Sequence, residues 1–118
     1  MLLPKSTPMA SPSATNSDPL VLEIQGEIDL HQAPQVKAQI EPLLEKKPAH
    51  FSVDLSRVEY MDSSGLALLI ETMQRIQSYG GKFTLFGLSQ SVRAIFEIAR
   101  LDQIFQIYPS REAALAAS

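Results

Sequence analysis

The order of apolar and polar side chains predicts a chain that alternates strands with helices. Two segments, 20–26 and 50–56, alternate apolar and polar residues as half-buried strands do. Two shorter apolar segments, 82–87 and 104–108, are predicted to form two more strands. Between these strands, apolar residues recur every three or four positions, which is typical of amphipathic helices.

Three such helical patterns can be read directly from the sequence. Their apolar positions are Val36, Ile40, Leu43 and Leu44; then Leu66, Leu69, Ile70, Met73 and Ile76; then Val92, Ile95, Phe96 and Ala99. Pro42 removes a backbone donor, so a kink or break is expected near Glu41. Gly80 and Gly81 are expected to end the second helix.

Serine residues mark the starts of the last two predicted helices. Ser89 is the expected N-cap of the third helix, and Ser110 that of a short fourth helix at the C-terminal end. On a projection of the second helix, Leu68 falls opposite the apolar stripe, together with Glu71, Thr72 and Arg75. Leu68 is therefore expected at the surface, available to a partner.

This element order predicts an α/β fold with a mainly parallel sheet of four to five strands. About four helices are expected to pack mostly on one face, because the first two strands alternate rather than being apolar throughout. The other face would be partly open, with Val21, Phe86 and Tyr108 as its apolar positions.

Composition is consistent with one domain and excludes several functions. The chain has 118 residues and no cysteine, so disulfides and thiolate metal sites are excluded, and a reducing compartment, the cytoplasm, is expected. A net charge of −3 argues against nucleic-acid binding, and no apolar run is long enough for membrane insertion. Residues 1–19 contain four prolines among Ser, Thr and Asn, and are expected to be a flexible leader before a domain at 20–118.

Two acidic loops are expected at the same sheet edge. In a parallel sheet the loops after the carboxyl ends of the strands share one edge, where ligands and partners bind. The residues expected to converge there are Glu27, Asp29 and His31 after the first strand, and Asp62, Ser63 and Ser64 after the second.

Each of these residues also has a purely structural interpretation. Asp62, Ser63 or Ser64 could simply cap the second helix, and Asp29 the turn before the first. Gly65 could only permit close packing. His31 and His50 lack a second ligand at metal-binding spacing, so surface positions are expected for both and no metal is expected.

Catalysis has little support in the sequence. A nucleophilic serine needs a base and an oxyanion site, and Ser63 lacks the G-x-S-x-G turn. The two phosphate-binding glycine motifs, G-x-G-x-x-G and G-x-x-x-x-G-K-[ST], are missing from the sequence as well. An enzyme is therefore not expected, and no cofactor is expected.

Three stretches in order resemble a STAS domain of the bacterial anti-sigma factor antagonist family. They are "GEIDLHQAPQ", "FSVDLSRVEYMDSSGLALL" and "GGKFTLFGLSQSVRAIFEIARLDQIFQIYPSREAAL". The resemblance implies a non-enzymatic protein that binds an anti-sigma factor serine kinase and makes it release its sigma factor. It also implies that the kinase, using ATP and magnesium, phosphorylates the serine after the aspartate, and that a serine phosphatase reverses the modification.

Carried onto this chain, the phosphorylation site is Ser63. The expected partner-binding residues around it are Asp29, Asp62, Ser64, Gly65 and Leu68. A phosphate there would meet free amides at a helix N-terminus, so the domain should stay folded and the effect should fall on the partner. Ser64 would be structural, its hydroxyl bonding a first-turn amide.

Two other functions fit the same resemblance. STAS-like domains also serve as docking subunits of membrane complexes that transport lipids or anions, and a small nucleotide-binding protein without turnover is a weaker alternative. Many relatives carry an extra strand before the first one seen here, whereas residues 1–19 are poor strand formers. An open sheet edge would then favour a homodimer.

Overall fold

The structure, a computed structural model, describes residues 19–117. Its elements are β1 (Leu20–Ile28), α2 (Ala33–Glu45), β2 (His50–Met61), α3 (Ser63–Ser78), β3 (Lys82–Phe86), α4 (Gln90–Ile98), β4 (Gln106–Tyr108) and α5 (Arg111–Ala116), with a 3₁₀ turn (Leu101–Gln103) before β4. The predicted leader, except for Pro19, lies outside the described residues.

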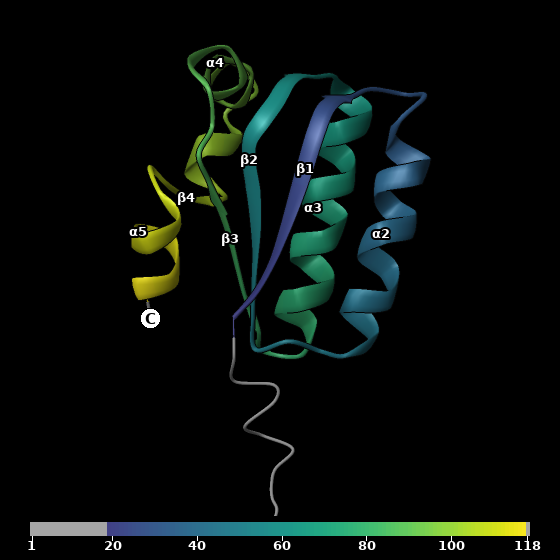
Figure 1. The fold of residues 1–118 in the computed structure, drawn as a ribbon, viewed down its shortest axis with the longest axis vertical. Helices are drawn as coiled ribbons and strands as arrows, with labels where there is room; N and C mark the ends of the chain where they lie inside the picture. Colours follow the sequence, from purple (N-terminus) through teal and green to yellow (C-terminus); the bar gives the residue numbers. More distant parts are fainter. Residues whose placement is uncertain (1–18, 118) are drawn as a thin grey trace, which may run out of the picture.

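The four strands form one sheet in the order β1-β2-β3-β4, and every neighbouring pair is parallel. The predicted α/β fold with a parallel sheet is confirmed (Figure 1). Because all strands run the same way, the loops that follow β1 and β2 meet at one edge. The extra strand that many relatives have before the first one would fall before residue 19, outside the described residues.

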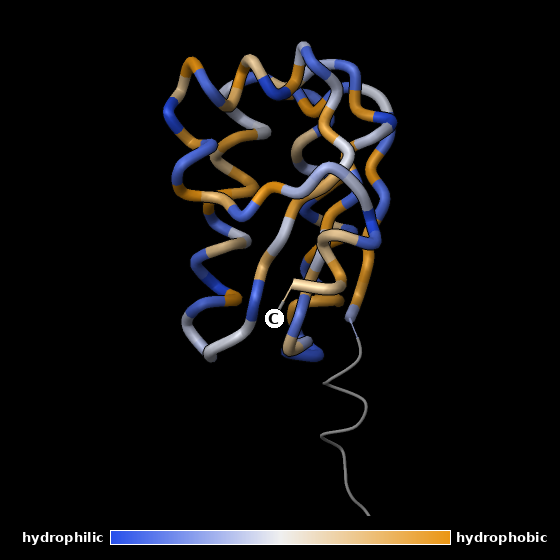
Figure 2. Tube along the Cα trace, turned by 90° about the vertical axis from the view of Figure 1, so that its left-hand side faces the viewer, coloured by the Kyte–Doolittle hydropathy of each residue, from blue (hydrophilic) through white to orange (hydrophobic). Residues whose placement is uncertain are grey.

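One face of the sheet carries the main core. Phe51, Val53 and Leu55 of β2 are fully buried there, and three contacting ring pairs continue the core toward α4. The ring centroids are 6.1 Å apart for Phe51–Phe83, 6.1 Å for Phe83–Phe105 and 5.6 Å for Phe96–Phe105. Apolar and polar segments alternate along the chain in Figure 2, as amphipathic elements around a core require.

The opposite face is less open than the sequence suggested. Phe86, expected to be exposed, has only 4% of its surface accessible, while Val21 and Tyr108 are half-buried. The reason is α5, which contacts β2, β3 and β4 and carries the fully buried Ala114. Helix α5 has only six residues, but it is enough to cover the Phe86 side chain.

The helix boundaries confirm most of the predicted caps. Ser89 Oγ accepts a hydrogen bond from the Val92 amide and Ser110 Oγ accepts one from the Ala113 amide, both at 3.2 Å. Gly80 adopts a φ of 84° after α3, and the Gly81 amide donates to the Ile76 carbonyl at 2.9 Å. This is a Schellman ending, which favours glycine at the left-handed position.

Two elements extend further than the sequence suggested. Helix α2 continues past Pro42 to Glu45, so the chain does not break near Glu41. Strand β2 extends five residues beyond the predicted end at residue 56, to Met61. It therefore carries Tyr60 up to the edge where α3 begins.

His50 is buried, which corrects the expected surface position. Its Nε2 lies 2.9 Å from Thr84 Oγ1, and the Thr84 hydroxyl donates to Ser52 Oγ at 2.8 Å. Because Thr84 uses its proton on Ser52, the imidazole donates to Thr84 Oγ1 from Nε2. Burial, and secondarily the charge of Lys82, lower the pKa of His50 from 6.5.

This network makes stability depend on pH. The folded protein takes up fewer protons than the unfolded chain below pH 6.5, so the free energy of unfolding should fall as the pH drops through and below that value. His50→Gln keeps a donor for Thr84 but cannot titrate, so its urea midpoint should change less between about pH 7.5 and about pH 5.5. Equal changes in both proteins would contradict a neutral, buried His50.

Candidate functional site

The carboxylate of Asp62 organises the edge where β1 and β2 end. Asp62 is the N-cap of α3, and its Oδ1 accepts hydrogen bonds from the amides of Ser64 (2.8 Å) and Gly65 (3.3 Å). Its Oδ2 accepts a third hydrogen bond, from the Leu30 amide at 3.1 Å in the loop after β1. One side chain therefore joins the helix start to the neighbouring loop, which confirms that the two acidic loops meet.

Asp29 stabilises the loop after β1 through hydrogen bonds to the backbone. Its Oδ1 accepts from the amides of His31 (3.0 Å) and Gln32 (2.9 Å), which fixes the turn that leads into α2. The structural interpretation of Asp29 is therefore confirmed. Glu27 lies within β1 and lines a different groove, together with Gln32, Gln35 and Gln39, so it does not join this cluster.

Gly65 is buried within the first turn of α3. A Cβ atom at this position would lie 2.5 Å from Met61 Cγ and 2.6 Å from the carbonyl oxygen of Ile28. Only glycine lets the first turn of α3 pack this closely on the ends of β1 and β2. The residue sets the height of the helix start above the sheet.

The two adjacent serines face different grooves. Ser63 is exposed and borders a groove of about 340 Å³ between α3 and α4, lined also by Tyr60, Leu66 and Ile98. Ser64 is half-buried and borders a groove of about 320 Å³ between α2 and α3, lined also by Leu30 and Lys37. The capping group is the Asp62 carboxylate, which confirms the capping interpretation for Asp62 and not for the Ser64 hydroxyl.

Large apolar side chains are exposed on both sides of Ser63. The accessible fractions are 69% for Leu30, 47% for Tyr60 and 84% for Ile98. Sequence reasoning missed all three. Ile98 could have been found as an apolar residue outside the stripe of the third predicted helix, and Leu30 as an apolar residue inside an acidic loop.

Leu68 is part of the core, which corrects its expected exposure. Only 7% of its surface is accessible, and Thr72 one turn later is 2% accessible, with its hydroxyl donating to the Leu68 carbonyl at 2.8 Å. Helix α3 packs against α2 as well as against β2 and β3, so its buried surface is wider than a single stripe. Leu66 and Ile70, assigned to the core stripe, are only half-buried.

Two of the first-turn amides of α3 that were expected to be free are already bonded. Those of Ser64 and Gly65 bond the Asp62 side chain, and that of Leu66 bonds the Asp62 carbonyl at 3.1 Å. A phosphate on Ser63 would therefore compete with a carboxylate for these donors. Within residues 19–117 there is no cluster of three or more metal-ligating side chains and no helix able to span a membrane.

The parallel sheet and its helices define a small domain of the α/β class, with an exposed apolar edge around one helix terminus. Residues 11–114 match the STAS domain family, and the chain belongs to that family. The match begins inside the segment expected to be a leader.

Several similar proteins are named as anti-sigma factor antagonists. The chain is 34% identical over 92 residues to the anti-sigma-B factor antagonist of Listeria monocytogenes, which covers 78% of this chain and 81% of that protein. Among solved structures, an anti-sigma factor antagonist from Mycobacterium paratuberculosis has 31% identity and a TM-score of 0.76, covering 82% of each chain. The Bacillus protein SpoIIAA in its phosphorylated form has 25% identity and a TM-score of 0.61, over 80% of this chain and 86% of that one.

Removing the Asp62 carboxylate should destabilise the domain. Asp62→Ala loses the cap of α3 together with the acceptor for the Leu30 amide, so the free energy of unfolding should fall by about 1–2 kcal/mol. Asp62→Asn keeps a capping oxygen and should lose less. Urea unfolding measures the free energy of unfolding of both variants. If Asp62→Ala is as stable as the wild type, Asp62 does not hold this edge together.

Gly65→Ala should also be destabilising, by about 1–3 kcal/mol, because the new methyl group would overlap the Ile28 carbonyl. The neighbouring Ser64→Ala is the matched control. It should change stability by less than about 0.5 kcal/mol, since Asp62 and not Ser64 provides the cap. A larger loss in Ser64→Ala than in Gly65→Ala would reverse these assignments.

Proposed function

We propose that the protein is a phosphorylation-switched anti-sigma factor antagonist. It binds an anti-sigma factor serine kinase in the cytoplasm while Ser63 is unmodified, and releases it once Ser63 carries a phosphate. The observation that carries this proposal is the position of Ser63, an exposed hydroxyl at the start of α3 on the border of an apolar groove. The names of the relatives and the phosphorylated form of SpoIIAA support it.

The groove explains why the unmodified protein would bind. Tyr60 and Ile98 expose large apolar side chains next to Ser63, and apolar surface of this kind gains free energy when a partner removes it from water. The backbone around the groove is fixed by the Asp62 cap, so little order has to be gained on binding. The Ser63 hydroxyl then lies at the centre of the contact.

The same geometry explains how a phosphate would act. It adds about −1.5 to −2 charges at the groove, directly beside the Asp62 carboxylate. Because Asp62 already uses the first-turn amides, the phosphate stays at the surface, where the partner must dock. Charge juxtaposed unfavourably at an interface costs several kcal/mol, and about 2.8 kcal/mol already weakens binding a hundredfold.

In this proposal the chemistry belongs to the partners. The kinase transfers the γ-phosphoryl group of magnesium-bound ATP to Ser63 Oγ, which releases ADP and the hydroxyl proton, and a phosphatase hydrolyses the product. The antagonist supplies an accessible hydroxyl on a rigid helix terminus and takes no catalytic part. Its function is binding.

Ser63 variants test the switch. Ser63→Ala should bind the anti-sigma factor of the same organism about as well as the unmodified wild type, but should not incorporate phosphate from ATP. Ser63→Glu should fold normally and bind at least about tenfold more weakly, because it places a charge in the groove. Calorimetry measures binding, and thermal melting controls for folding.

Phosphopeptide mass spectrometry of the wild-type protein decides which hydroxyl is used. Phosphate mapped to Ser63 supports the assignment. Phosphate on Ser64, or on neither serine after incubation with the organism's anti-sigma factors and ATP, would rule out the proposed switch.

A further inference from the structure

We infer that the groove between α2 and α3, with Leu30 at its rim, is a second docking surface that holds an apolar side chain of the same anti-sigma partner whether or not Ser63 is phosphorylated. This inference rests on the proposed function for the identity of the partner. It concerns a surface on the far side of the helix terminus from the Ser63 groove.

The groove is apolar at its floor and open along its length. Leu30, Ala33 and Pro34 form one wall, and Ala67 and Leu68 form the other. Its volume of about 320 Å³ has room for a bulky side chain. Ala67 is exposed and small, so the α3 wall is recessed at this point.

Leu30 is exposed on a backbone that is held in place. Its side chain is 69% accessible, although its amide donates to Asp62 Oδ2 at 3.1 Å. The next two amides in the loop, those of His31 and Gln32, donate to Asp29 Oδ1. An apolar side chain on so constrained a loop is a preorganised contact, which loses little entropy when a partner covers it.

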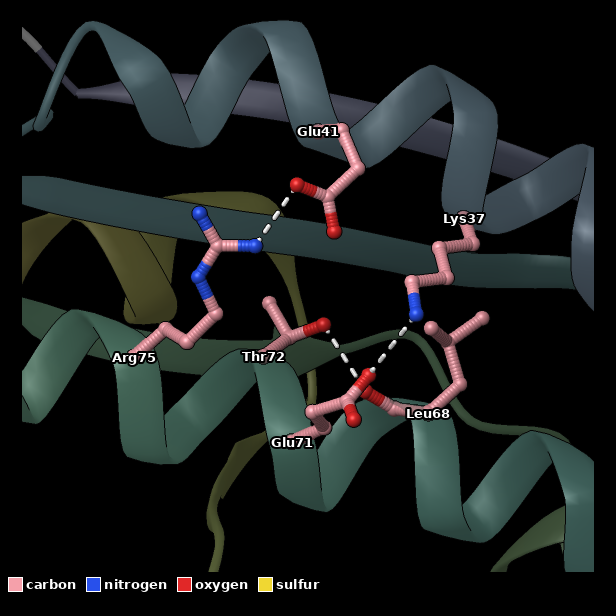
Figure 3. A network of polar contacts seen from close by, with 6 residues as sticks. All are labelled: Lys37, Glu41, Leu68, Glu71, Thr72 and Arg75. Atoms are coloured by element: carbon pink, nitrogen blue, oxygen red, sulfur yellow. Dashed lines mark hydrogen bonds and ion pairs between the residues drawn. The ribbon is translucent and has the colours of Figure 1, made fainter.

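Helix α2 packs on α3, and two ion pairs between partly exposed side chains link the two walls of the groove. Lys37 Nζ lies 3.6 Å from Glu71 Oε1, and one turn further Arg75 Nη1 lies 2.7 Å from Glu41 Oε1 (Figure 3). The hydrogen bond between Arg75 and Glu41 lowers the pKa of Glu41 and raises that of Arg75. The groove is thus formed before any partner arrives.

The chemistry of the groove favours a protein side chain over a small molecule. The charged groups at its rim, Lys37 and Glu71, neutralise each other, and pockets for small polar ligands need convergent polar groups to orient them. The groove also adjoins the Ser63 surface across the helix terminus, because Ser64 lines it and Asp62, which lines the Ser63 groove, accepts a hydrogen bond from the Leu30 amide. A partner covering Ser63 would extend over it.

Phosphorylation should leave this surface unchanged. The phosphate on Ser63 would sit on the α3–α4 groove, whereas the α2–α3 groove is bordered by the next residue, on the other side of the helix. The Ser63 groove would then set the strength of binding, and the Leu30 groove would add a constant contribution. The phosphorylated antagonist would retain a weak hold on its partner.

Leu30→Asp tests the inference, with Ile104→Asp as the matched control, because Ile104 is also exposed (54%) but is not among the residues that line either groove. The probe is the purified anti-sigma factor that phosphorylates Ser63. Leu30→Asp should weaken its binding at least about tenfold and raise the KM for phosphorylation with kcat unchanged, since Leu30 does not touch the reacting hydroxyl. Both variants should melt within about 3 °C of the wild type.

A second comparison tests independence from phosphate. In the Ser63→Glu background, Leu30→Asp should weaken binding by the same factor as in the wild type, because separate sites contribute additively. The inference is overturned if Leu30→Asp binds the anti-sigma factor as tightly as the wild type, or if Ile104→Asp weakens binding equally. It is also overturned if Leu30→Asp no longer weakens binding in the Ser63→Glu background. If instead Leu30→Asp weakens binding while Ser63→Glu does not, the docking surface stands and the proposed switch fails.

Discussion

The site depends on the three hydrogen bonds that the Asp62 carboxylate accepts. Two of them hold the first turn of α3 and the third holds the Leu30 amide of the loop after β1. Without this carboxylate the helix terminus and the loop would be tied only through the strands beneath them. With it, Ser63, Leu30 and the two grooves have fixed relative positions, which a surface that recognises one partner requires.

This use of Asp62 also determines where a phosphate can act. A helix N-terminus with free amides attracts anions and would fold a phosphate into the domain. Here Asp62 has already bound the donors of Ser64 and Gly65, so an anion on Ser63 gains little from the domain itself. Its charge is then felt mainly by whatever protein docks on Tyr60 and Ile98. The capping interaction and the proposed switch are therefore two consequences of one arrangement.

Much of the fold could be predicted from the sequence because it depends on local rules. Ser89 and Ser110 cap helices through their own neighbours, and Gly80 ends α3 through its own φ angle. The errors concern packing between distant elements. Leu68 and Thr72 looked exposed because the projection of one helix contains no α2, and His50 looked exposed because nothing local shows its bond to Thr84. The convergence of the acidic loops followed from topology. The hydrogen bond from the Leu30 amide to Asp62 could not be predicted, because nothing local in the sequence indicates it.

Helix geometry explains why two adjacent serines, Ser63 and Ser64, face different grooves. Successive residues in a helix are rotated by about 100° about the axis, so neighbours cannot face the same surface. At the start of α3 this rotation directs Ser63 toward α4 and Ser64 toward α2. The bulk of a group added to the first residue therefore lies in one groove, although the second residue is its direct neighbour. A helix terminus set between two other helices can in this way separate a contact that is regulated from one that is constant.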